Sequence, residues 1–192
     1  IYVVVGYLKE QFKGLEKEYN ELKLIENPYY STYGSGYSLY LGLQKAFETG
    51  ADEIVFAEGD LYFNEDDYQR VCSADKSVVT VNRNPILADK SVALYFDIAG
   101  EIRYIYDTGH NELLIKEPFF AIYNSGQVWK FSDKEIAKKV FSKIDKEEWK
   151  GTNLIFVEKY FRTIGRDKYE LITLGNWVNC NTLDDFNQIQ EY

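Results

Sequence analysis

Residues 53–60 read Glu53-Ile54-Val55-Phe56-Ala57-Glu58-Gly59-Asp60, an apolar run closed by two carboxylates around a glycine. A short apolar run that ends in a turn signal is typical of a buried β-strand. In open α/β sheets, ligands bind beyond the carboxyl ends of the strands. Asp60 and Glu58 are therefore candidate oxygen ligands for Mg²⁺, and Gly59 would let a phosphate or a backbone segment approach. A simple turn after the strand is the alternative interpretation.

The residues before this strand alternate between strand and helix patterns. Residues 1–6 and 21–26 are expected to form strands. Residues 8–19 carry apolar side chains at helical spacing among charges, and residues 38–49 show a second helix pattern. A β-α-β-α-β order implies parallel strands with helices on both faces of the sheet.

A glycine-containing loop precedes the second of these helices and reads Tyr33-Gly34-Ser35-Gly36-Tyr37-Ser38. Glycines ahead of a helix N-terminus can bind a phosphate through backbone N–H groups, and Ser38 would then be a nucleotide-binding residue. The spacing matches neither the P-loop nor the dinucleotide-binding fingerprint. An N-cap role for Ser38 is the preferred interpretation.

The remainder of the chain predicts antiparallel strands and then further helices. Strands are expected over residues 77–82, 91–97, 101–107 and 112–122. They are followed by helices over residues 132–144 and 152–163, a strand over residues 168–174 and a final helix. We therefore expect one mixed α/β domain over residues 1–192, with a mainly parallel sheet flanked by helices and an antiparallel strand insertion. The antiparallel strands could alternatively extend the main sheet.

Two helix starts carry recognisable capping residues. Ser132 and Glu135 have the spacing of a capping box, and Thr182 is followed three residues later by Asp185. Just before the second of these caps, Asn179 and Asn181 alternate, so they would share one side of an extended segment. Their side-chain oxygens could complete the shell of a hard cation, although a purely structural approach to the last helix is the better interpretation of this segment alone.

Composition excludes several classes of function. The net charge of −9 and the mixing of lysines with acidic residues argue against nucleic acid as a partner. A bound divalent cation would still allow a phosphorylated small substrate. The sequence contains no run long enough to cross a membrane, and its first residues do not have the pattern expected of a signal peptide. Cys72 and Cys180 are isolated, which favours reduced thiols and a cytoplasmic location.

The single histidine, His110, lies in an expected hairpin turn, where exposure to solvent is the default interpretation. A Ser/His/Asp catalytic triad needs a histidine, so no such triad can be assembled without His110. Metal sites built from cysteine and histidine are also excluded, which leaves Mg²⁺ or Mn²⁺ as the plausible metal.

Taken in order, these segments resemble the small-molecule nucleotidyltransferases. The resemblance begins in residues 5–12, 26–30 and 37–41 and is strongest to bacterial phosphocholine and phosphonate cytidylyltransferases, next to the sugar-phosphate nucleotidyltransferases. Glu58-Gly59-Asp60 matches the strand-end metal aspartate of that family. Asn124-Ser125-Gly126 is similar to its Asn-Ala-Gly substrate segment, and residues 179–185 are similar to its Asp-x-Asn-Thr-x-x-Asp element. The resemblance implies a nucleotide-diphosphate-sugar transferase-like fold.

The reaction implied by this resemblance is attack of a phosphate or phosphonate oxygen on the α-phosphorus of a nucleoside triphosphate, with release of pyrophosphate. CTP would be the nucleotide, Mg²⁺ the cofactor, and Asp60 and Asn181 the metal-binding and catalytic residues. The small phosphorylated acceptor would meet Asn124, and a cationic head group on it would meet Trp129, Trp177 and Glu158. Core packing is an equally good interpretation of either tryptophan.

Two features depart from the family pattern. The glycine-rich loop with its arginine and Pro-Lys, which grips the triphosphate, would lie before residue 1. Because the chain contains no methionine and opens on Ile1 in a strand pattern, we interpret it as a fragment. In addition, Asn179 stands where an acidic residue is common. Two alternatives therefore stay open, namely a nucleotide-sugar-dependent glycosyltransferase and a non-catalytic binding domain.

Overall fold

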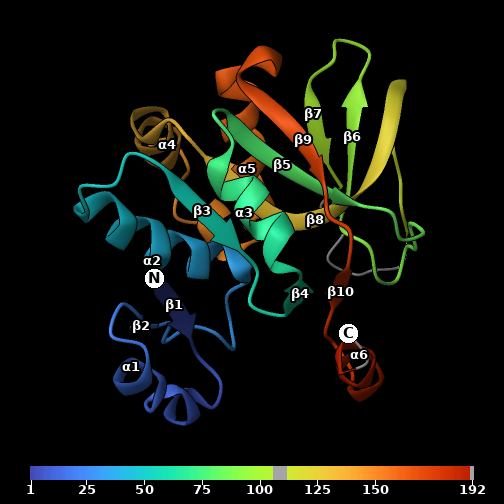
Figure 1. Ribbon diagram of the computed structural model, residues 1–192. Helices are drawn as coiled ribbons and strands as arrows, with labels where there is room; N and C mark the ends of the chain where they lie inside the picture. The colour runs from blue at the N-terminus through green and yellow to red at the C-terminus, as the bar shows by residue number, and fades with distance from the viewer. Residues whose placement is uncertain (106–111, 191–192) are drawn as a thin grey trace. The chain divides into compact units, whose positions relative to one another are not determined.

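The computed structural model describes residues 1–105 and 112–190, without the side chain of Gln188 (Figure 1). It divides into two compact units. Unit 1 comprises Ile1–Asp52 and Lys134–Tyr160, and unit 2 comprises Glu53–Asp133 and Phe161–Tyr192. That the two act as one domain stays a prediction. His110 and the turn expected at residues 108–111 lie outside the described residues.

Unit 1 contains a parallel pair of strands and the helices around it. Strands β1 (Tyr2–Val5) and β2 (Lys23–Glu26) pair in parallel, as expected. Helix α2 (Ser35–Glu48) packs on β1 through Leu39 and Leu43, which are both buried. The other elements of the unit are α4 (Lys134–Phe141), the short η2 (Glu148–Lys150) and the greater part of α5 (Leu154–Ile164).

The helix expected over residues 8–19 is wrong. The structure has the short η1 (Lys9–Phe12) and α1 (Leu15–Glu18), with Gly14 between them. Neither segment has a fully buried residue, so tertiary packing gives little support to a longer helix here. Leu8 also has a left-handed backbone (φ 52°), which starts a tight turn rather than a helix.

Helix α2 begins earlier than expected, and Ser38 is not its N-cap. Gly34 holds the N-cap position, and its amide donates to the carbonyl of Lys150 (2.7 Å). A Cβ at Gly34 would come within 2.4 Å of the carbonyl oxygen of Gly151, so this close backbone approach requires a glycine. The loop glycines thus serve helix packing.

Unit 2 is built on a sheet whose central strand is the long β8 (Phe119–Phe131). The order is β7-β6-β8-β5-β9, and β3 also pairs with β8. At one end of β8, residues 128–131 pair with β3, and at the other end residues 119–124 pair with β6. The other strands are β3 (Ile54–Ala57), β5 (Ser77–Asn82), β6 (Ala93–Asp97), β7 (Ile102–Tyr104) and β9 (Tyr169–Thr173).

The expected mixed α/β class, with a central sheet flanked by helices, is confirmed. The sheet is less parallel than expected, because β8 runs antiparallel to β3, β5 and β6. The described part of the sheet has one parallel pairing, between β5 and β9. The predicted strand at 112–122 is in fact the later and longer β8, and the antiparallel strands belong to the main sheet.

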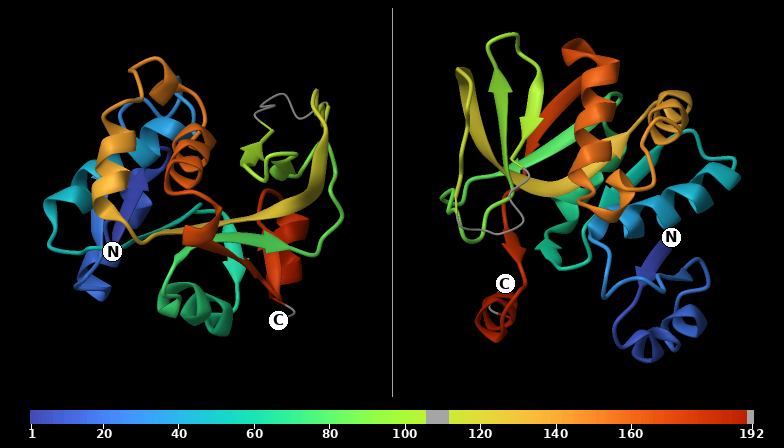
Figure 2. Two further views of the ribbon diagram at one scale, coloured as in Figure 1. Left: turned by 90° about the horizontal axis from the view of Figure 1, so that it is seen from above. Right: turned by 180° about the vertical axis from the view of Figure 1, so that it is seen from behind.

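Helices cover both faces of this sheet. Val71 of α3 (Glu65–Ser73) packs with Val78, Val128 and Ile172, while Phe161 of α5 packs on the ring of Phe131. Val128 and Phe131 point to opposite faces because side chains alternate along a strand. Figure 2 shows α3 on one side of β8. Helix α3 was not predicted from the sequence. Its N-cap is Asn64, whose side chain accepts a hydrogen bond from the Asp67 amide (2.8 Å).

The two predicted capping boxes differ in outcome. Thr182 caps α6 (Leu183–Ile189) as expected, since its hydroxyl accepts from the Asp185 amide and Asp185 accepts from the Thr182 amide (2.8 Å). The Ser132 box is wrong: α4 begins at Lys134, and the hydroxyl of Ser132 instead pairs with that of Ser77 (2.8 Å). Ser132 directly follows β8 and does not start a helix.

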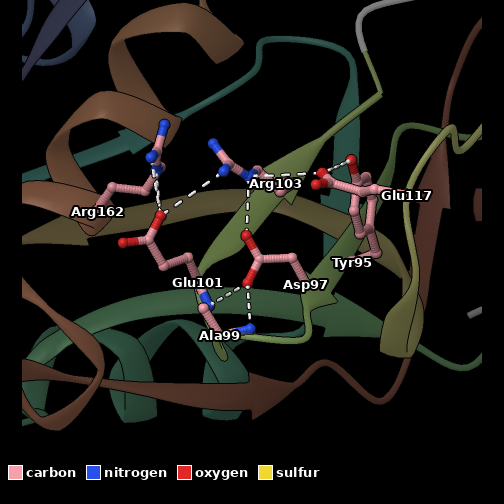
Figure 3. A network of polar contacts seen from close by, with 7 residues as sticks. All are labelled: Tyr95, Asp97, Ala99, Glu101, Arg103, Glu117 and Arg162. Atoms are coloured by element: carbon pink, nitrogen blue, oxygen red, sulfur yellow. Dashed lines mark hydrogen bonds and ion pairs between the residues drawn. The ribbon is translucent and has the colours of Figure 1, made fainter.

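An ion-pair network fixes the β6–β7 hairpin of unit 2 (Figure 3). The Arg103 guanidinium lies among the carboxylates of Asp97 (3.1 Å), Glu101 (3.7 Å) and Glu117 (3.7 Å), and Arg162 of α5 also pairs with Glu101. The carboxylate of Asp97 accepts from the amides of Ala99 and Glu101 as well. The network therefore connects the hairpin to α5.

Within the described ranges, no helix is both long and apolar enough to span a membrane. Cys72 and Cys180 are free thiols, as expected.

Candidate functional site

Three segments of unit 2 meet after strand β3. They are the turn at residues 58–60, residues 124–128 of β8, and residues 176–181 around β10 (Trp177–Asn179). The Glu58 amide donates to the carbonyl of Gln127 (3.2 Å), and the Cys180 amide donates to the carbonyl of Asp60 (2.7 Å). The indole N–H of Trp177 donates to the carbonyl of Gly126 (2.8 Å). We call this meeting point the β3-end site.

Asp60 brings a carboxylate to the β3-end site. It directly precedes β4 (Leu61–Phe63), which pairs antiparallel with β10. Its Oδ1 atom is buried and has no hydrogen-bond partner among residues 1–105 and 112–190. Buried carboxylate oxygens normally have a donor or a cation beside them, so this atom is suited to a hard cation.

Asn181, the second candidate metal-binding residue, lies one residue beyond a main-chain contact with Asp60. Asn181 follows Cys180, whose amide is bonded to Asp60. The side-chain nitrogen of Asn181 donates to Oδ1 of Asn179 (2.6 Å). The side-chain oxygen Oδ1 of Asn181 is then the atom that could coordinate a cation. Asp185 accepts from the backbone of Asn181 and from Thr182, and the Thr182 hydroxyl bond holds the pKa of Asp185 below its usual value.

The candidate ligands for a cation are few. The described part of the chain has no group of three or more histidine, cysteine, aspartate and glutamate side chains that could hold a metal ion. Any cation at the β3-end site would therefore depend on the carboxylates of the turn at residues 58–60, on amide oxygens and on oxygens from a bound molecule. That donor set matches Mg²⁺, which keeps several non-protein ligands and often binds substrate phosphates.

Strand β8 is irregular where it passes the β3-end site. The pairing with β5 shifts between Val79 and Val81, and the hydroxyl of Thr80 fills the gap by bonding both the carbonyl (2.7 Å) and the amide (3.1 Å) of Val128. A Cβ at Gly126 would lie 2.5 Å from Oγ1 of Thr80, so the bulge needs a glycine. The predicted Asn-Ser-Gly segment is thus a structural bulge as well as a candidate contact.

Asn124 presents a second unpartnered oxygen in the same stretch of β8. Its side-chain nitrogen donates to the carbonyl of Pro85 (3.2 Å), but its buried Oδ1 has no partner in the described residues. The neighbouring Asn82 is satisfied, since its nitrogen donates to the carbonyl of Ser125 (2.8 Å) and its oxygen accepts from the Asn84 amide. Of Asn82 and Asn124, it is therefore Asn124 whose side-chain oxygen can accept a hydrogen bond from a ligand.

Gln127 is a residue that the sequence did not indicate. Its backbone is left-handed (φ 56°), it is 2% exposed, and its Nε2 has no partner within the described ranges. Residue type gave no signal, because glutamine is common on surfaces. Its position directly after Asn-Ser-Gly is the one hint the sequence offers.

The two candidate tryptophans differ in position. Trp177 is half-buried, and its indole is tied to β8 beside the site. Trp129 is completely buried, donates to the hydroxyl of Tyr104 (2.8 Å) and stacks on Phe56. The structure therefore favours core packing for Trp129, which leaves no face for a substrate.

The remaining candidates divide between the units. Gly59 lies in the turn of the β3-end site, and a Cβ there would meet nothing within 4 Å. Ser38 and Glu158 belong to unit 1. Ser38 lies inside α2 and accepts from the side chain of Asn27 (3.0 Å), and Glu158 is a buried residue of α5. The β3-end site itself is made of residues of unit 2.

A buried carboxylate holds the segment that leads into β10. Asp67 of α3 accepts from the Gly175 amide (2.6 Å) and pairs with Arg70 (2.8 Å), whose guanidinium also donates to the carbonyl of Thr173 (3.3 Å). Asp67 is 4% exposed. Helix α3 thus anchors the residues before Trp177.

Comparison with known proteins gives a consistent result. The sequence model of the family described as "Domain of unknown function (DUF6564)" matches residues 1–192. Choline-phosphate cytidylyltransferase of Streptococcus pneumoniae is 25% identical over 196 residues, covering 100% of this chain and 74% of that protein.

Solved structures share the fold. The CTP:phosphocholine cytidylyltransferase from Streptococcus pneumoniae superposes with a TM-score of 0.65 at 20% identity, over 100% of this chain and 77% of that one. The inositol-1-phosphate CTP transferase from T. maritima gives a TM-score of 0.66 at 16% identity, over 98% and 73%. These relatives are nucleotidyltransferases, which agrees with the resemblance seen in the sequence.

Proposed function

Because this chain belongs to the DUF6564 family and aligns along its whole length with a cytidylyltransferase, we propose that the protein transfers a nucleotidyl group to a phosphorylated small molecule. The nucleotide is CTP and the acceptor carries a phosphate or phosphonate group. An acceptor oxygen attacks the α-phosphorus of CTP, the bond from that phosphorus to the bridging oxygen of the β-phosphate breaks, and pyrophosphate leaves.

The unpartnered Oδ1 of Asp60 is the observation that carries this proposal. A buried carboxylate oxygen without a donor is costly unless a cation or a ligand group meets it. Its position after a sheet strand, beside the amide-rich segment 179–181, is the position where ligands of α/β sheets bind. The same chain needs no protein nucleophile, because the acceptor supplies the attacking oxygen.

Asp60 and the side-chain oxygen of Asn181 would hold Mg²⁺. When bound, the ion would neutralise charge on the phosphates and orient the attacking oxygen. The carboxylate and amide oxygens of this pair fit that ion better than a soft metal. Magnesium dependence and the metal role of both residues are part of the proposal.

The neighbouring residues would position the acceptor. The free Oδ1 of Asn124 would accept a hydrogen bond from it, and the half-buried ring of Trp177 offers an aromatic face beside the site. Such positioning lowers the barrier, because phosphoryl chemistry depends mainly on alignment and on charge stabilisation. The preference for CTP and a cytoplasmic location belong to the proposal as well.

Pyrophosphate release tests this function. The natural full-length protein is incubated with Mg²⁺, one nucleoside triphosphate and one acceptor, using phosphocholine, 2-aminoethylphosphonate and a sugar 1-phosphate in turn. Release that requires both substrates and that EDTA abolishes is the expected result. Binding of a nucleoside diphosphate sugar without any pyrophosphate release would instead support a glycosyltransferase, and no turnover with any pair would contradict the proposal.

A further inference from the structure

Gln127 is buried, and its side-chain nitrogen has no partner. The residue is 2% exposed, and Nε2 makes no hydrogen bond to any part of the chain that the structure describes. Buried amide groups are nearly always paired, because an unpaired donor loses its bonds to water without replacement. The missing acceptor is therefore expected on a molecule that binds there.

The backbone of Gln127 is also strained. Its φ of 56° lies in the left-handed region, where glycine fits without steric cost and glutamine does not. Leu8 is the other non-glycine residue with positive φ in the described ranges, and it lies at an exposed turn. Gln127 thus combines backbone strain with a buried unpaired donor, and strained residues gather at ligand sites.

Gln127 lies within the β3-end site. Its carbonyl accepts from the Glu58 amide, which continues the pairing of Ala57 with Val128 by one residue. The preceding Gly126 binds the indole of Trp177. An unpaired donor therefore lies on β8 directly beside the turn that carries the unpaired acceptor of Asp60.

We propose that Nε2 of Gln127 donates a hydrogen bond to a phosphoryl oxygen of the bound substrate. A neutral amide donor suits an oxygen whose charge a cation already balances, and Asp60 is the residue proposed to hold that cation. The inference rests on the proposed nucleotidyl transfer and adds a substrate-contacting residue to it. The phosphoryl oxygen belongs either to the nucleotide or to the acceptor, and the experiment distinguishes the two.

Amide NMR on the natural full-length protein tests the contact directly. The Nε2 resonances of Gln127 are identified by their absence in Gln127→Glu, which has nearly the same shape but no amide donor. CTP, phosphocholine and 2-aminoethylphosphonate are then added separately, each with Mg²⁺. A shift of the Gln127 resonances with CTP assigns the contact to the nucleotide, and a shift with either acceptor assigns it to the acceptor.

The outcomes separate this proposal from the proposed function. Resonances that stay in place with all three probes overturn the Gln127 contact, even if pyrophosphate is released. A shift without pyrophosphate release from any pair supports the contact and overturns the proposed reaction.

Kinetics and stability provide a second test through Gln127→Gly. This change removes the hydrogen-bond donor and the backbone strain together. Because the strain is relieved, we expect an unchanged or higher Tm. Because one hydrogen bond to the substrate is lost, we expect the KM for the contacted substrate to rise about tenfold. Leu8→Gly relieves the same type of strain outside the site and should leave KM unchanged. A lower Tm with an unchanged KM for Gln127→Gly would show a purely structural role and overturn the proposal.

Discussion

The backbone amide of Cys180 donates a 2.7 Å hydrogen bond to the carbonyl oxygen of Asp60. This bond extends the pairing of Leu61 with Asn179 and joins the turn after β3 to the segment that contains Asn181. Both atoms belong to the main chain. The Asp60 side chain can therefore be changed while this junction stays in place, which separates its chemical role from its structural one.

Asp60→Asn should abolish nucleotidyl transfer with little loss of stability. The carboxylate oxygen Oδ1 has no partner in the described chain, so the substitution removes no hydrogen bond at that atom. We expect activity to fall at least about a hundredfold, since even outer-shell partners of metal ligands cost 10–100-fold. Pyrophosphate release and thermal unfolding measure the two effects. Asp75→Asn, at an exposed carboxylate of the same unit, is the matched control and should change neither.

Gly126→Ala and Gly59→Ala should affect opposite properties. A Cβ at Gly126 would lie 2.5 Å from Oγ1 of Thr80 and 2.8 Å from Cδ1 of Leu174, so we expect a loss of about 1–3 kcal/mol in the free energy of unfolding. A Cβ at Gly59 meets open space, so Gly59→Ala should keep full stability and lower activity by crowding the ligand. Denaturant unfolding and pyrophosphate release separate the two variants. Equal stability for both would contradict the packing argument.

Local signals predicted the parts of the site that depend on neighbouring residues. An apolar strand ending in Gly59-Asp60 placed the carboxylate, and the side-chain to backbone reach of Thr182 and Asp185 placed the last cap. In both of these cases a short-range rule contained the information. Asn181 comes near Asp60 through a long-range contact instead, because β4, which follows Asp60, pairs with β10, which precedes Asn181.

Features that depend on distant contacts could not be predicted in this way. The left-handed backbone of Gln127 follows from a bulge in β8 that Thr80 of another strand completes. The burial of Trp129 depends on Tyr104 and Phe56, which are remote in sequence. The helix pattern in residues 8–19 is real, but none of its side chains is fully buried in the structure, and periodicity alone does not reveal whether a partner face exists.

Asp67→Ala should destabilise the protein and disturb the β3-end site together. The buried carboxylate of Asp67 accepts from the Gly175 amide and orients Arg70 onto the carbonyl of Thr173. Its removal leaves the Gly175 amide without this acceptor, which costs about 1–3 kcal/mol. Because Gly175 precedes Trp177, we also expect a higher KM for the acceptor. Asp67→Asn keeps an acceptor oxygen and should recover part of both losses, and equal losses in the two variants would contradict this assignment.

The stability of the β6–β7 hairpin should fall at acidic pH through Asp97. Burial raises the pKa of this carboxyl, but the amides of Glu101 and Ala99 and the Arg103 guanidinium together hold it below its usual value. A carboxyl whose pKa is lower in the folded state stabilises the fold above its unfolded pKa of about 3.9. That contribution is lost as the pH falls through the folded pKa.

Asp97→Asn isolates this effect, because an amide cannot ionise and pairs poorly with Arg103. We expect the variant to unfold at a lower Tm than the natural protein at pH 7, and the difference in Tm to shrink steadily below about pH 4, where the natural carboxyl becomes protonated. Thermal unfolding of both proteins over a series of pH values measures the difference. A Tm difference that stays constant into the acid range would show that Asp97 stabilises the hairpin through its shape and neutral hydrogen bonds, and not through its charge.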